Sequence, residues 1–99
     1  MLNINQTVDG EKLQLALEGR LDTTTAPQLE AVIKNMPEEI SEIDFDLAEL
    51  EYISSAGLRV LLYARRVLGS DGALRIENAN EIVTEVFEVT GFSDILNIG

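Results

Sequence analysis

Hydrophobic and polar residues alternate along three segments of the chain, with the period of two that is typical of strands with one buried face. The alternation predicts strands over about residues 13–17, 43–47 and 74–76. Asp9-Gly10 precedes the first of these segments and predicts a tight turn from a weaker strand over about residues 2–8. The first two strands are therefore expected to form a β-hairpin.

Between the later strands, the hydrophobic period changes to that of an amphipathic helix. The first helical stretch carries one apolar stripe, made of Leu29, Val32, Ile33 and Met36. Thr25 at the N-cap, with Gln28 three residues later, has the sequence of a capping box. Pro37 is expected to end this helix.

Two further helices are expected nearer the C-terminus. One covers about residues 55–68 and ends at Gly69, with a buried stripe of Leu58, Leu61, Leu62 and Val67. The other begins at Asn80 and ends at Gly91, with a buried stripe of Ile82, Val83, Val86 and Phe87. Residues 92–96 are expected to form a final packed segment, either helical or strand-like.

The predicted order of elements is β-β-α-β-α-β-α, followed by the C-terminal segment. Strands joined through helices run parallel, with right-handed crossovers. Because the two longer strands keep a polar face, the helices are expected mainly on one face of the sheet. The sequence thus predicts an α/β fold: a single domain over residues 1–99, with a mixed, mostly parallel sheet of about four strands. Its 99 residues, 45% of them hydrophobic, are enough for one core.

Charge and composition narrow the classes of function. Seven Lys and Arg against 18 Asp and Glu give a formal charge of −11. Nucleic acids and anionic membranes are therefore poor partners, whereas a protein with a basic face would be attracted. The chain has no Cys and no His, which excludes disulfides, thiolate chemistry and histidine-based triads. No signal peptide or membrane span is recognisable, so a cytoplasmic protein is expected.

A serine-rich turn stands out over residues 50–58, where a predicted strand leads directly into a helix. It places Ser54 and Ser55 at the first turn of that helix. In one interpretation, Ser54 caps the helix and Ser55 is an ordinary first residue. In the other, a hydroxyl here carries a phosphate, which the free N–H groups and the helix dipole would stabilise. Gly57 is expected to keep the approach open because it carries no side chain.

A second polar turn, at residues 19–26, also follows a predicted strand and precedes a helix. Carboxyl ends of parallel strands share one edge of the sheet, where ligands of open α/β sheets bind. We therefore expect this turn and the serine turn to lie side by side. Asp22 either hydrogen-bonds within its own turn or contributes to a recognition surface beside Ser55.

Other polar residues indicate no catalytic or metal site. Asp44 and Asp46 share one strand face and could ligate a hard cation, but two carboxylates without further ligands are typical of a solvated face. The serines have no evident base, since Lys12 and Lys34 lie in other segments, so nucleophilic catalysis is not expected. No glycine-rich phosphate loop is present.

Three segments resemble the STAS domain of bacterial anti-sigma-factor antagonists. The strongest match is YISSAGLRVLL at residues 52–62, supported by GRLDTTTA at 19–26 and TGFSDIL at 90–96. The order of strands and helices also fits. The resemblance therefore covers nearly the whole chain.

The helix start in this family usually reads Asp-Ser-Ser/Thr-Gly-Leu, and the serine directly after the Asp is phosphorylated. Aligned on the Gly-Leu pair at 57–58, that serine corresponds to Ser55. Ser54 stands in place of the Asp, and Ala56 in place of the second hydroxyl. The resemblance thus implies phosphorylation at Ser55, with Ser54 as the alternative. The loop aspartate of the family corresponds to Asp22.

The resemblance implies a non-enzymatic anti-sigma-factor antagonist that acts by partner switching and needs no cofactor. The unphosphorylated form would bind an anti-sigma serine kinase, phosphorylation would end the binding, and a PP2C-type serine phosphatase would restore it. The expected partner-binding surface comprises Asp22, Thr23, Thr24, Ser54, Ser55, Gly57 and Arg59. The alternative in the same fold is a small STAS subunit of a lipid ABC transporter, which acts by binding alone.

Overall fold

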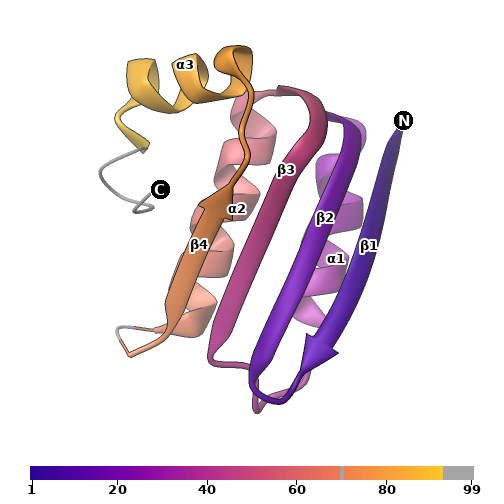
Figure 1. Cartoon of the computed structure of the whole chain (residues 1–99), viewed down its shortest axis with the longest axis vertical. Coiled ribbons are helices and arrows are strands. Elements are labelled where there is room, and N and C mark those ends of the chain that lie inside the picture. The colour runs from indigo at the N-terminus through magenta and orange to yellow at the C-terminus, as the bar shows by residue number, and fades with distance from the viewer. Residues whose placement is uncertain (70, 93–99) are drawn as a thin grey trace.

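Among the residues that the structure describes, four strands form one mixed sheet, in the order β1-β2-β3-β4 (Figure 1). The computed structural model describes residues 1–69 and 71–92. Its strands are β1 (Leu2–Asp9), β2 (Lys12–Leu21), β3 (Glu42–Ile53) and β4 (Ala73–Glu77). β1 pairs antiparallel with β2, and the β2–β3 and β3–β4 pairs are parallel. The predicted fold class and order of elements are confirmed, although each strand is longer than the alternation indicated.

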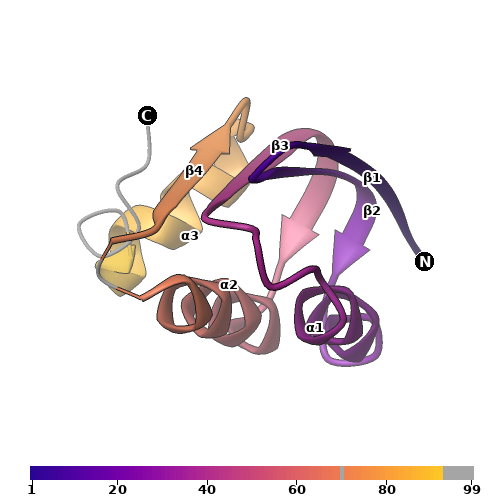
Figure 2. The same cartoon turned by 90° about the horizontal axis from the view of Figure 1, so that it is seen from below.

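In the described part of the chain, three helices accompany the sheet: α1 (Ala26–Lys34), α2 (Ser55–Leu68) and α3 (Glu81–Thr90). α1 and α2 lie side by side under one face of the sheet, as expected (Figure 2). α3 lies at the end of the sheet toward which β4 points (Figure 1). The Asn80 side chain joins this helix to the sheet, because its Oδ1 accepts from Val83 N at 2.8 Å and its Nδ2 donates to Leu50 O at 3.0 Å.

The core lies between the sheet and α1 and α2. Alternate residues of β2 and β3 point toward these helices and are fully buried: Leu13, Leu15, Leu17, Ile43, Phe45 and Leu47. The helices cover them with Leu29, Ile33, Leu58, Leu61 and Ala64. The period of two in the strands and the helical stripes therefore meet in one apolar layer.

Two residues expected in the core, Val67 and Ile82, are exposed, to 45% and 58%. The buried stripe of α2 continues from Leu61 through Ala64 toward Leu68, which leaves Val67 on the rim. In α3 the buried positions are Val83 and Phe87, so Ile82 lies on the adjacent, outward side of the helix. In both helices the apolar stripe is wider than the surface in contact with the core, which caused both errors.

The ends of α1 also differ from the prediction. Thr25 occupies the N-cap, but its side chain makes no capping hydrogen bond, so the capping box with Gln28 does not form. Instead the Thr25 hydroxyl donates to Arg20 O at 2.8 Å. The helix ends at Lys34, before Pro37, and the Asn35 side chain donates to Ala31 O at 2.8 Å. Of the segment predicted over 92–96, only Phe92 is among the described residues; it packs partly buried against the core.

On the sheet face opposite α1 and α2, Asp44 departs from the expected solvated face. Asp46 is exposed there, but Asp44 is only 7% exposed, with Lys12 Nζ 3.6 Å from its Oδ2. Its neighbours across the sheet are Gln14 on β2 and Arg75 on β4, whereas Asp46 lies between Ala16 and Glu77. Within residues 1–69 and 71–92, no group of three or more carboxylates could hold a metal ion.

Candidate functional site

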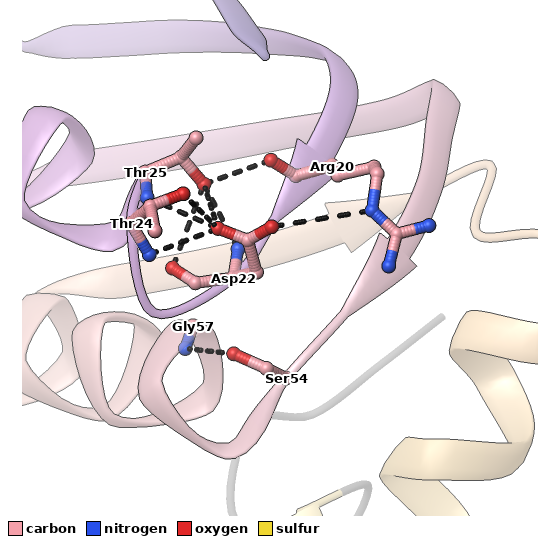
Figure 3. A network of polar contacts seen from close by, with 6 residues as sticks. All are labelled: Arg20, Asp22, Thr24, Thr25, Ser54 and Gly57. Carbon is pink, nitrogen blue, oxygen red and sulfur yellow. Dashed lines mark hydrogen bonds and ion pairs between the residues drawn. The ribbon is translucent and has the colours of Figure 1, made fainter.

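The two polar turns lie side by side at the carboxyl ends of β2 and β3, as expected. Leu21, the last residue of β2, pairs with Ile53, the last residue of β3. The backbone of Ser54 then donates to Leu21 O at 2.9 Å. Parallel pairing therefore brings the Asp22 turn next to the start of α2 (Figure 3).

The Asp22 side chain organises its own turn. Its Oδ1 accepts from Thr24 N at 2.9 Å, Thr24 Oγ1 at 2.7 Å and Thr25 N at 3.2 Å. The Thr25 hydroxyl completes the turn by accepting from Asp22 N at 2.9 Å. Of the two roles considered for Asp22, hydrogen bonding within its own turn is thus present in the structure. The role in recognition stays a prediction.

The second carboxylate oxygen of Asp22 is less engaged. Among the described residues, Oδ2 faces only Arg20, whose Nε is 3.9 Å away (Figure 3). The hydrogen bond from the Thr24 hydroxyl is the main reason that the pKa of Asp22 lies below its ordinary value of 3.8. Because the folded-state pKa is depressed, the stabilisation is present above the unfolded value and is lost as the pH falls through the folded one.

Arg20 and Tyr52 form part of this edge that the sequence analysis missed. They are paired across β2 and β3, and the Arg20 guanidinium lies 4.6 Å from the centre of the Tyr52 ring. This cation–π contact places the guanidinium beside the Asp22 carboxylate. The sequence could have indicated this contact. Arg20 and Tyr52 each stand just before the end of a strand, and the two strands are parallel neighbours.

Ser54 and Ser55, in the turn between β3 and α2, are held differently. Ser54 is the N-cap of α2, with φ −100° and ψ 176°, and its Oγ accepts from Gly57 N at 3.4 Å (Figure 3). Ser55 is the first residue of the helix and is exposed. Among the described residues, its hydroxyl makes no hydrogen bond. A modifying enzyme could therefore reach Ser55 without disturbing the cap.

Gly57 has a different role from the expected one. It is buried, and a Cβ atom here would lie 2.7 Å from Leu21 Cγ and 2.9 Å from Ile53 Cγ1. The missing side chain therefore lets α2 approach the ends of β2 and β3, and it does not open a path from solvent to the hydroxyls. Gly57 supports the predicted surface from beneath.

The remaining predicted residues border a groove of about 310 Å³ between α1 and α2. Thr23 and Arg59 line it, together with Ala26, Pro27, Glu30, Ala56, Val60 and Tyr63. Thr24 is exposed on the neighbouring turn. The structure thus brings the predicted surface residues to one edge of the molecule, with Gly57 below it.

Replacing Ser54 with Asp is expected to leave the free energy of unfolding within about 0.5 kcal/mol of the parent, because Asp and Ser cap helices comparably. Chemical denaturation measures the difference. Ser54→Ala is the matched control and should cost about 0.5–2 kcal/mol, since it removes the acceptor for Gly57 N. A large loss in Ser54→Asp alone would contradict the N-cap geometry.

Sequence comparison supports the resemblance. The family model described as "Mlab, STAS domain" matches residues 4–97. The anti-sigma-B factor antagonist of Bacillus subtilis is 26% identical over 98 residues, covering 98% of this chain and 90% of the relative. The protein of the same name from Staphylococcus epidermidis is 28% identical over 99 residues, covering 98% and 92%.

Solved structures share the fold. An anti-sigma factor antagonist from Mycobacterium paratuberculosis matches with a TM-score of 0.83 at 20% identity, covering 99% of this chain and 85% of that one. The phosphorylated form of the Bacillus cell fate determinant SpoIIAA matches with a TM-score of 0.74 at 20% identity, covering 100% and 91%. No helix in the described part of the chain is long and apolar enough to cross a membrane. With nearly its whole length matched by the family model, the chain belongs to the STAS domain family.

Proposed function

We propose that this chain is an anti-sigma-factor antagonist whose unphosphorylated form binds an anti-sigma serine kinase. The kinase transfers the γ-phosphoryl group of ATP to the Ser55 hydroxyl, and the phosphorylated form is released. A PP2C-type serine phosphatase then hydrolyses the phosphoserine and restores the binding form. The curated relatives named anti-sigma-B factor antagonists support the class of function.

One observation carries the choice of Ser55. Its hydroxyl is exposed at the first residue of α2, next to the Asp22 turn, whereas the Ser54 hydroxyl caps the helix. A kinase that binds this edge would find Ser55 available as the acceptor. In this proposal the domain contributes binding and a phosphate acceptor, and the catalysis belongs to the partner.

A second candidate is the small STAS subunit of a lipid ABC transporter, which acts by binding alone. Two departures from the phosphorylated pattern favour it: Ser54 replaces the usual Asp, and Ala56 replaces the second hydroxyl. The retained Ser55 favours the antagonist.

Intact-mass analysis after incubation with the purified kinase and ATP separates the two functions. The antagonist should gain one phosphate, which Ser55→Ala abolishes and Ser54→Ala retains. Phosphate on Ser54 would contradict the site, and no phosphate, together with copurification of transporter subunits, would favour the second candidate.

Reversing the charge at Asp22 is expected to weaken binding of the kinase, because Asp22 Oδ2 faces only Arg20 within the described chain and is available to a basic partner surface. Titration calorimetry of Asp22→Lys measures the loss, and circular dichroism checks the fold. Asp22→Asn is the matched control, since it keeps the acceptor for Thr24 and Thr25 but removes the charge. Equal affinity in Asp22→Lys and the parent would exclude Asp22 from the interface.

A further inference from the structure

Arg59 lies one helical turn after Ser55 on α2. Residues four apart on a helix are neighbours, with Cβ atoms about 5–6 Å from each other. Both side chains are exposed. α2 is a continuous helix from Ser55 to Leu68, so this spacing is fixed by the backbone.

The Arg59 guanidinium has no carboxylate partner within residues 1–69 and 71–92. By contrast, Lys12, Arg20 and Lys34 each face a carboxylate, and Arg65 donates to the carbonyls of Gly69 and Gly72.

Three charged groups on the neighbouring turn and helix each face an opposite charge. On the adjoining turn, Asp22 and Arg20 face each other. On α1, Glu30 lines the same groove as Arg59 but lies 3.4 Å from Lys34. Among the cations of α2 that have no carboxylate partner within the described residues, Arg59 is the nearest in sequence to position 55.

We propose that a phosphate on Ser55 pairs with the Arg59 guanidinium along the surface of α2. The proposal rests on Ser55 being the phosphorylated residue. Phosphate accepts hydrogen bonds from guanidinium in a bidentate geometry, and an anion placed four residues before a cation is the favourable order on a helix.

The pair changes what the binding surface offers to a partner. Arg59 belongs to the predicted interface, where its free guanidinium can meet a partner carboxylate. Phosphorylation adds a charge of about −1.5 to −2 and engages this guanidinium at the same time. The modified surface thus gains an anion and loses an available cation in one step.

The test uses phosphoserine incorporated at position 55 during translation, so that it does not depend on any kinase. Phosphorus NMR then follows the second pKa of the phosphate, which is about 6 in the absence of a partner. With Arg59 present this pKa should be lower than in Arg59→Gln by about 0.2–0.4 units, from the usual strength of such helix pairs. Arg59→Lys should retain part of the shift, and about 1 M salt should remove it.

Arg66→Gln is the matched control. Arg66 lies on the same helix, 11 residues from Ser55, which is about 16 Å along the axis. This exceeds the Debye length of about 8 Å at physiological salt, so this variant should leave the phosphate pKa unchanged. Equal pKa values in the parent and Arg59→Gln would overturn the pairing. That result would leave the proposed function intact, whereas failure of a kinase to modify Ser55 would contradict the proposed function and leave the phosphorus NMR result unchanged.

Discussion

Phosphorylation of Ser55 is expected to weaken binding of the anti-sigma partner nearly a thousandfold without changing the fold. A like charge in the partner at about 4 Å costs roughly 4 kcal/mol at an effective dielectric constant near 20. Each 1.4 kcal/mol corresponds to about a tenfold change in affinity. Local repulsion is therefore sufficient for release.

A global rearrangement is not needed and is not expected. The favourable interaction of a phosphate with a helix start is about 0.3–1 kcal/mol, and about 2 kcal/mol when partly buried. Shifting a protein almost completely from one of two conformations to the other takes about 5.5 kcal/mol. The phosphate therefore acts at the interface.

Calorimetry of partner binding by four altered forms, with the parent as reference, separates the effect of charge at position 55 from the effect of bulk. Ser55→Ala should bind like the parent and resist modification, whereas Ser55→Glu and the phosphorylated protein should bind poorly. Ser55→Gln is the matched control, because it has nearly the bulk of Glu without its charge, and it should bind better than Ser55→Glu. A backbone amide spectrum that shifts throughout the phosphorylated domain would refute the local mechanism.

Replacing Leu21 with Ala is expected to lower the free energy of unfolding by about 2–5 kcal/mol, the usual range for a buried leucine. Leu21 is fully buried at the end of β2, where its side chain fills the space beside Gly57. Gly57→Ala should be destabilising by itself, because overpacking costs about 1–3 kcal/mol. The better helix propensity of Ala offsets up to about 1 kcal/mol of that cost. Urea denaturation measures both variants.

Combining the two changes tests the contact itself. The space left by Leu21→Ala should accept the new Cβ, so the double variant should be more stable than the sum of the single effects by at least about 0.5 kcal/mol. Leu17→Ala, combined with Gly57→Ala, is the matched control, since Leu17 is equally buried but four residues earlier on β2. Additive effects in both pairs would show that Leu21 does not restrict position 57.

The order of elements could be predicted from the sequence because it depends on local signals. Alternation over 13–17 and 43–47 marks strands, and Gly69, Asn80 and Gly91 mark helix ends through their own backbone preferences. The adjacency of the two polar turns also followed, since carboxyl ends of parallel strands share an edge. These features need no knowledge of side-chain packing.

Features that depend on the exact strand register, or on how closely a helix approaches the sheet, were not predictable from the sequence. The Arg20–Tyr52 contact requires the irregular pairing between β2 and β3, which shifts between Gly19 and Arg20. The sequence indicated a capping role for the Thr25 hydroxyl. In the folded turn this hydroxyl instead donates a hydrogen bond to the Arg20 carbonyl. The need for a glycine at position 57 arises from the close approach of α2 to the ends of the strands.

The spatial order of the strands, β1-β2-β3-β4, repeats their order along the chain. During synthesis, each strand that leaves the ribosome can therefore add to the edge formed by the strand before it, and no strand must insert between two others. The edge that carries Asp22 and Ser55 is encoded by β2, β3 and their turns, so its residues emerge before those of β4 and α3. Because domains generally fold as units, the final packing of this edge follows once the rest of the core is present. For this domain, β4 can then add to the free edge of β3 without displacing a strand that has already paired.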